Sequence, residues 1–166
     1  MSAARWTPNV TVAAIIEADG RYLLVEEETR EGLRLNNPAG HLERGESPLQ
    51  AVVREALEET ARTFSPAALV GIYLARFDIG GGGADDDVTY LRFAYAGTAG
   101  EPLPGRKLDT GIVRTLWLTA AEVRASAARH RSPLVLQGIE DHLAGRRHPL
   151  DVVSAHPSLA RPWRPG

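Results

Sequence analysis

The stretch that decides the fold is "GHLERGESPLQAVVREALEETA", residues 40–61. Ser47 followed by Pro48 predicts a helix start, because a hydroxyl side chain caps free N–H groups and proline fits the first helical position. Gln50, three residues after Ser47, completes a capping box. Apolar residues then recur at helical spacing. We therefore predict a loop that leads into a helix ending near residue 62.

Three glutamates lie close together in this helix. Glu58 and Glu59 follow Glu55 by three and four residues, so the carboxylates project from one face and repel one another. Hard divalent cations such as Mg²⁺ or Mn²⁺ prefer carboxylate oxygen and would relieve that repulsion. The alternative is a solvated acidic face, because glutamate is also a good helix former.

An arginine in the same stretch is placed to join the loop to the helix. Arg54 precedes the glutamates, and a charge-assisted pair with Glu46 would hold the loop against the helix. Gly40 and Gly45 would let the loop fold tightly at the helix start. The whole stretch reads G-x5-E-x7-R-E-A-x-E-E, and each fixed position has a physical role.

The rest of the chain alternates strands and helices. Two apolar runs, residues 10–16 and 21–28, flank Asp19-Gly20 and predict a β-hairpin. The first run is apolar on both faces, so it should lie inside a sheet. Residues 35–47 contain Pro, Gly and Asn and predict a loop, and residues 78–87 predict a mobile one. Further strands are predicted over residues 69–77, 88–97 and 111–118, and helices over residues 119–130 and 133–144. This order indicates an α+β domain with a mixed β-sheet between helices, an α/β/α arrangement.

Composition narrows the classes of function. The chain has 166 residues, a net charge of −2 and no cysteine. A disulfide scaffold, a cysteine zinc site and a thiolate nucleophile are excluded, and nothing in the charge balance favours nucleic acid as a partner. No apolar run approaches the roughly 20 residues that span a bilayer. We expect one domain over residues 1–166, a cytoplasmic location, no membrane partner, and a monomer or homodimer.

The pattern of residues 40–59 resembles the Nudix box, G-x5-E-x7-R-E-U-x-E-E-x-G-U, where U is a bulky apolar residue. The resemblance implies a Nudix fold with its core over about residues 9–153, and metal-dependent hydrolysis of a diphosphate bridge. Three positions depart from it. Ala56 is small for the first U, Ala61 stands where glycine is usual, and Arg62 stands at the last apolar position. These departures concern the end of the helix more than the acidic cluster.

The resemblance also implies roles for individual residues. Glu55, Glu58 and Glu59, together with the backbone carbonyl of Ala39, are implied as ligands of Mg²⁺, with Mn²⁺ possible. Glu46 and Arg54 are implied to brace the loop against the helix as part of the catalytic machinery.

The base that activates the attacking water is less well defined. Glu58 or Glu59 is the first candidate, and Asp109 in "KLDTGI" is an alternative outside the box. Many such enzymes carry an acid near the following strand, where this chain has Gly111.

Outside the acidic helix the candidates are substrate contacts. His41 follows the box glycine and would touch a phosphate or the leaving group, although a loop histidine is more often a surface group. Arg76 and Arg92 lie in predicted strands that should flank the cleft, and phosphate recognition favours arginine. Phe77 is one of several aromatic residues that would stack a base, with packing in the core as the alternative.

Segments across residues 9–153 further resemble one bacterial branch of the family, which acts on nucleoside tri- and diphosphates and on a thiamine-pathway pyrimidine diphosphate. That resemblance implies such a small phosphorylated substrate here. One alternative is another diphosphate: a nucleotide sugar, a dinucleoside polyphosphate or an oxidised nucleotide. A second is a non-catalytic regulator that binds a nucleotide, which the intact set of box acids disfavours.

Overall fold

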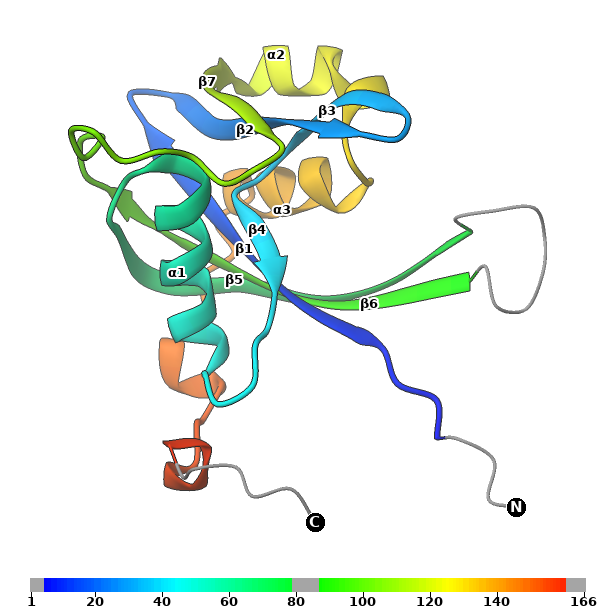
Figure 1. The fold of residues 1–166 in the computed structure, drawn as a ribbon, viewed down its shortest axis with the longest axis vertical. Coiled ribbons are helices and arrows are strands. Elements are labelled where there is room, and N and C mark those ends of the chain that lie inside the picture. Colours follow the sequence, from blue (N-terminus) through cyan, green and yellow to red (C-terminus); the bar gives the residue numbers. More distant parts are fainter. Residues whose placement is uncertain (1–4, 79–86, 161–166) are drawn as a thin grey trace.

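The computed structural model describes residues 5–78 and 87–160 (Figure 1). The strands are β1 (Asn9–Ala18), β2 (Arg21–Thr29), β3 (Gly32–Asn36), β4 (Ala39–His41), β5 (Phe64–Asp78), β6 (Asp87–Ala99) and β7 (Ile112–Thr119). The helices are α1 (Pro48–Thr60), α2 (Ala120–Ala125) and α3 (Leu134–Leu143), with 3-10 turns at Ala127–Arg129, Leu150–Val152 and Pro157–Ala160. The loop predicted at residues 78–87 lies almost entirely outside the described residues.

The strands form a mixed sheet in the order β3-β2-β1-β6-β5. β1 runs parallel to β6, and its pairs with β2 and β4 are antiparallel. β7 pairs with β2. The sheet with its helices confirms the α+β class. The predicted hairpin is also confirmed, because Asp19 and Gly20 both take positive φ, at 51° and 75°, between β1 and β2.

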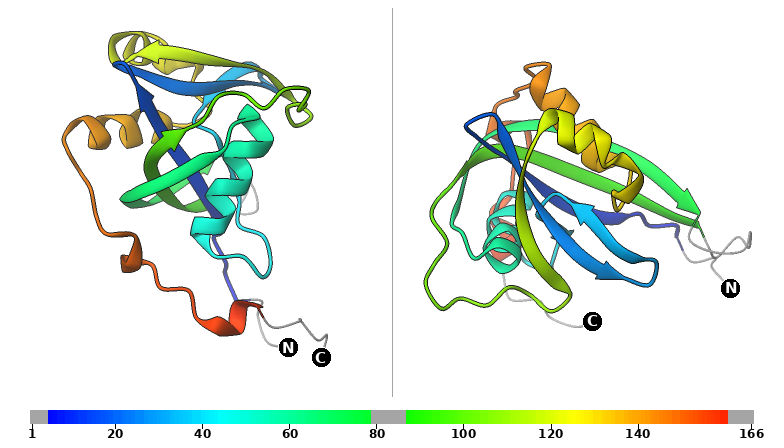
Figure 2. Two further views of the ribbon diagram at one scale, coloured as in Figure 1. Left: turned by 90° about the vertical axis from the view of Figure 1, so that its left-hand side faces the viewer. Right: turned by 90° about the horizontal axis from the view of Figure 1, so that it is seen from above.

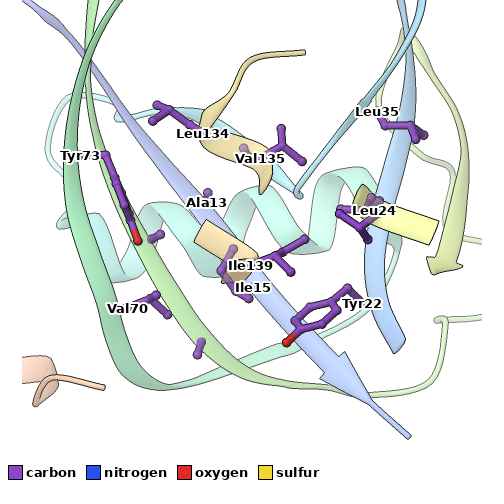
Figure 3. Close-up of a cluster of buried hydrophobic side chains, with 14 residues drawn as sticks. Ala13, Ile15, Tyr22, Leu24, Leu35, Val70, Tyr73, Leu134, Val135 and Ile139 are labelled. Carbon is purple, nitrogen blue, oxygen red and sulfur yellow. The ribbon is translucent and has the colours of Figure 1, made fainter. Parts of the chain in front are cut away.

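β1 lies inside the sheet, as its sequence predicted, and separates two apolar clusters. Ala13 and Ile15 point toward α3 and pack with Val135 and Ile139 (Figure 3). Val12, Ala14 and Ile16 point the other way, into a cluster with residues of α1. Figure 2 shows the two helices on different sides of β1. Because alternate residues of a strand face opposite ways, this one apolar run anchors both helices.

α1 begins as the sequence predicted and ends slightly earlier. Ser47 accepts from the N–H of Gln50, and the Gln50 side chain accepts from the N–H of Ser47. The helix ends at Thr60, and Ala61 takes the left-handed conformation with φ 55°. Ala61 thus adopts the backbone angle for which glycine is usual at this position. Arg62 places its guanidinium 5.6 Å from the centre of the Trp117 ring.

Two predictions of local structure were wrong. Residues 35–47 were expected to be loop throughout, yet β3 pairs with β2 and β4 pairs with β1, with the break at Asn37-Pro38. The helix expected from residue 119 to 130 stops at Ala125. There the Ser126 hydroxyl donates to the carbonyl of Val123 at 3.0 Å, a local bond that competes with helix continuation.

Candidate metal-binding active site

The acidic face of α1 lies against the short strand β4. The backbone N–H of Ala39 donates to Glu59 Oε2 at 2.9 Å. Both Glu55 and Glu59 are buried, each with 8% of its surface exposed. The helix and the strand therefore bring the Glu55 and Glu59 carboxylates together with the backbone of Ala39, whose carbonyl the resemblance to the Nudix box implied as a metal ligand.

Gly40 is required by the position of Glu55. A Cβ atom added at Gly40 would lie 2.1 Å from the carboxyl carbon of Glu55 and equally close to its Oε1 atom. Real Cβ atoms never approach so closely, and the contact is with a buried side chain. The strand at Gly40 is thus shaped to receive the Glu55 carboxylate, which explains the glycine at the start of the box.

Arg54 is the hub of the loop and the helix. Its Nε and Nη2 atoms donate to the two oxygens of Glu46 at 3.0 and 2.7 Å, and Nη2 also donates to the carbonyl of His41 at 3.0 Å. Its Nη1 donates to Glu55 Oε1 at 2.7 Å and to Glu58 Oε2 at 3.0 Å. The pair between Arg54 and Glu46 that the spacing suggested is present, and the same guanidinium also neutralises two of the acids.

The acids carry perturbed protonation equilibria. Burial, together with the nearby carboxylates of Glu55, Glu27 and Asp109, raises the pKa of Glu59 to about 8, against the hydrogen bond from Ala39. Burial also raises the pKa of Glu55, against the stabilising effect of Arg54. By contrast, the Arg54 hydrogen bonds lower the pKa of Glu46. Crowded, buried carboxylates of this kind are stabilised by a cation.

These residues fit a divalent cation in donor chemistry. Glu55, Glu58 and Glu59 offer only carboxylate oxygens, which Mg²⁺ and Mn²⁺ prefer, and the raised pKa values show that negative charge there lacks full compensation. In residues 5–78 and 87–160 no three acid or histidine side chains already converge as a metal site. Glu58 reaches toward Arg54, so binding would require its carboxylate to turn.

Asp109 also lies near the cluster. Its backbone N–H donates to the carbonyl of Glu58 at 3.0 Å, which ties the segment before β7 to the last turn of α1. Its carboxylate raises the pKa of both Glu55 and Glu59. The structure therefore places the alternative base candidate beside the box acids, although it is distant in sequence.

The three candidate substrate contacts do not form one group. His41 is exposed on β4, with its ring centre 6.3 Å from that of Tyr90. Arg92 pairs with Tyr73 across the β5–β6 ladder, whereas Arg76 pairs with Thr89. Since facing residues alternate between the two sides of a sheet, Arg76 and Arg92 lie on opposite faces. Arg92 is buried and Arg76 is exposed.

Sequence reasoning missed the polar residues around Arg92. Thr11 faces Arg92 across the β1–β6 ladder, and Glu27 and Asn36 lie on the paired strands β2 and β3. All three are at least half-buried. No distinct sequence signal marked them, because Glu27 lies within a run of three glutamates and Asn36 is the last residue of β3.

Comparisons with known proteins place the chain in a family. The model of the NUDIX domain matches residues 5–137. The chain belongs to the Nudix family. It is accordingly a Nudix hydrolase, acting on phosphoric anhydrides, which confirms the reading of residues 40–59. Nudix hydrolases generally use divalent metals.

Individual relatives agree with this assignment. The chain is 34% identical to the phosphatase NudJ of Escherichia coli strain K12 over 88% of this chain and 90% of that protein. A NUDIX hydrolase of Nitrosomonas europaea superposes with a TM-score of 0.82 at 52% identity, covering 90% of this chain and 98% of the other.

A more distant structure shares the fold. It is a bifunctional NMN adenylyltransferase/ADP ribose pyrophosphatase of Francisella tularensis, complexed with AMP and a Mn ion. The match has a TM-score of 0.60 at 16% identity and covers 86% of this chain and 43% of the other.

Proposed function

We propose that this Nudix hydrolase is Mg²⁺-dependent and cleaves the diphosphate bridge of nucleoside tri- and diphosphates or of a thiamine-pathway pyrimidine diphosphate. The observation that carries the proposal is the buried group of Glu55 and Glu59 against Ala39, with Glu58 beside them on α1. The resemblance to the phosphatase NudJ over most of both chains supports a phosphatase activity.

In this proposal Glu55, Glu58, Glu59 and the Ala39 carbonyl hold the metal, with Mn²⁺ as a substitute. When bound, the metal neutralises phosphate charge and lowers the pKa of a water molecule. The protein contributes position: Gly40 admits the Glu55 carboxylate, and the Ala39 N–H fixes that of Glu59. Arg54 and Glu46 keep the loop before α1 in place, so that the Ala39 carbonyl stays beside the acids.

A general base must take a proton from the attacking water. Glu59 is one candidate for this role, because its carboxylate is buried among the box acids and held in place by the Ala39 N–H. Glu58 is the second candidate, since its carboxylate is partly exposed. Asp109 is the candidate outside the box, and its carboxylate lies close enough to raise the pKa of Glu55 and of Glu59.

The proposal is tested with a panel of phosphorylated compounds and identification of the products by ³¹P NMR. The panel contains GTP, GDP, a pyrimidine diphosphate, a nucleotide sugar, a dinucleoside polyphosphate and an oxidised nucleotide, each with and without Mg²⁺. We expect release from the first three and a large loss in Glu58→Gln. Release from the nucleotide sugar alone would favour another diphosphate as the substrate. Binding without any release would favour a nucleotide-sensing regulator.

None of the helices in the described part of the chain is long and apolar enough to cross a membrane. We propose a cytoplasmic enzyme of one domain, present as a monomer or homodimer, whose partner is a small phosphorylated substrate. Size-exclusion chromatography with light scattering tests the oligomeric state.

A further inference from the structure

Arg92 is a buried arginine with no bonded partner among the described residues. Only 8% of its surface is exposed. Its Nε and Nη1 atoms are buried and donate no hydrogen bond, and within the described residues no carboxylate forms an ion pair with it. A buried unpaired donor costs about 1 to 3 kcal/mol. This cost at one position indicates that the N–H donors of Arg92 are placed to bind a ligand.

Several oxygen atoms with no hydrogen-bond partner in the described part of the chain belong to the strands near Arg92. Thr11 Oγ1 and Asn36 Oδ1 are buried and unpartnered. The Glu27 carboxylate attracts Arg92 from longer range, and so does that of Glu59. Glu27 itself interacts with Asn36 and lies 3.2 Å from Arg131 Nε. The Thr11 oxygen thus lies on the same face of the sheet as the free N–H donors of Arg92, and the Glu27 carboxylate is near enough to attract them.

Aromatic rings lie beside this polar group on the same face of the sheet. Tyr90 is two residues before Arg92 on β6, so both side chains point the same way. The Phe77 ring lies 5.9 Å from that of Tyr90, and the His41 ring lies 6.3 Å from it on the other side. Rings at this spacing offer flat faces to a planar ligand.

We propose that Arg92, Thr11, Glu27 and Asn36 form the subsite for the heterocyclic base of the substrate. Arg92 donates to a carbonyl oxygen or ring nitrogen of the base, the oxygens of Glu27 and Asn36 accept from its N–H or amino group, and Tyr90 contacts its ring. This assignment rests on the proposed function. It replaces the expectation that Arg92 binds phosphate.

The charge around Arg92 favours a neutral base over phosphate. A phosphate placed there would face the Glu27 carboxylate, which acts on Arg92 and, as an ionised group, can donate no hydrogen bond to phosphate. A neutral heterocycle avoids that repulsion. A heterocyclic base also supplies hydrogen-bond partners for the unpartnered atoms near Arg92, because the edge of a nucleobase carries an acceptor next to a donor.

The test uses probes that carry only one half of a substrate. Nucleosides supply the base without phosphate, and inorganic tripolyphosphate supplies phosphate without a base. Dissociation constants are measured by NMR titration in wild type and in Arg92→Gln. We expect nucleoside binding to weaken by about 5- to 150-fold, the range of a good bidentate contact to a base, while tripolyphosphate binding with Mg²⁺ stays within twofold.

Two further variants serve as controls for the Arg92→Gln result. Arg21→Gln removes a strand arginine that donates to Glu122 and to the Trp117 carbonyl at the other end of β2, and it should leave both dissociation constants unchanged. Arg92→Lys keeps the positive charge but loses the paired N–H donors. We expect it to lose nucleoside binding and keep tripolyphosphate binding. If Arg92→Gln fails to fold, Arg92→Lys still tests whether nucleoside binding depends on the guanidinium.

Several outcomes would overturn the assignment. The first is an absence of nucleoside binding, which would leave ordered water as the partner of Arg92. The second is equal nucleoside affinity in wild type and Arg92→Lys. The third is a loss of tripolyphosphate binding in Arg92→Gln that matches its loss of nucleoside binding. Since nucleoside binding needs neither metal nor turnover, its dependence on Arg92 would support the subsite even if no compound were hydrolysed. Hydrolysis without nucleoside binding would reject the subsite alone.

Discussion

Replacing Arg54 with methionine should destabilise the protein strongly, because one guanidinium holds the loop and α1 together. Methionine keeps most of the side-chain volume and removes the charge. The wild-type side chain makes five hydrogen bonds of 3.0 Å or less, four to carboxylates and one to the His41 carbonyl. Hydrogen bonds to charged groups contribute about 1.5 to 3 kcal/mol each, and they are not additive when they share one donor group.

The size of the effect follows from partial burial. The Arg54 side chain is 23% exposed, and those of Glu46 and Glu55 are 15% and 11% exposed. Breaking a fully buried pair costs about 3 to 5 kcal/mol, and exposed pairs contribute about 0 to 1 kcal/mol. We therefore expect Arg54→Met to lower the free energy of unfolding by about 2 to 4 kcal/mol, measured by urea denaturation without divalent ions.

A matched control separates burial from simple ion pairing. Arg124 also makes two hydrogen bonds to one glutamate, Glu140, but this pair is half-exposed. Arg124→Met should leave the stability nearly unchanged. Equal losses in the two variants would refute the reasoning, since the Arg124 pair is half-exposed and makes only two hydrogen bonds.

Acid provides a second readout of the same interaction. Arg54 holds the folded-state pKa of Glu46 below its usual value. The contribution of Glu46 is therefore present above the unfolded pKa and is lost as pH falls through the lower, folded pKa. Arg54→Met should show less loss of stability over this acid range than wild type does.

Three further changes have defined outcomes. Gly40→Ala should weaken Mg²⁺ binding at least about tenfold by isothermal titration calorimetry, because its Cβ would displace the Glu55 carboxylate; unchanged affinity would count against Glu55 as a ligand. Ala61→Gly should raise the free energy of unfolding, measured by urea denaturation, by about 0.5 kcal/mol. Relief of the left-handed conformation at Ala61 contributes about 1 to 2 kcal/mol, and the loss of one buried methyl group costs about 0.8 kcal/mol. Burial lowers the pKa of His142, whose Nδ1 lies 2.8 Å from the Tyr22 hydroxyl, so its contribution is present above pH of about 6.5 and is lost as pH falls. The melting temperature of His142→Asn should accordingly fall less than that of wild type between pH of about 8 and 5, and parallel curves would contradict this.

The sequence predicted the parts of the fold that rest on local chemistry. The capping box of Ser47, the Asp19-Gly20 turn and the apolar run of β1 each determine their structure within a few residues. The pair of Arg54 with Glu46 could be predicted because the helix fixes where Arg54 points. The partners of Arg54 on α1 itself, Glu55 and Glu58, follow only from the side-chain geometry.

Other features depend on contacts between distant segments. β4 is three residues long, and its strand structure comes from pairing with β1 rather than from its own sequence. The approach of Asp109 to Glu58 joins residues far apart in the chain. Arg92 and Arg76 have similar surroundings in the sequence, and only the register of β5 with β6 shows that one is buried and the other exposed.

The central claim is that the acids of α1 make this Nudix hydrolase dependent on a divalent cation. The most direct test is the initial rate of phosphate release from GDP over a Mg²⁺ titration, for wild type and for Glu59→Gln, with circular dichroism to establish that both are folded. We expect no release without a divalent ion, and a rate in Glu59→Gln that is lower by at least about a hundredfold. A wild-type rate that is independent of Mg²⁺, or a Glu59→Gln variant with full activity, would contradict the account.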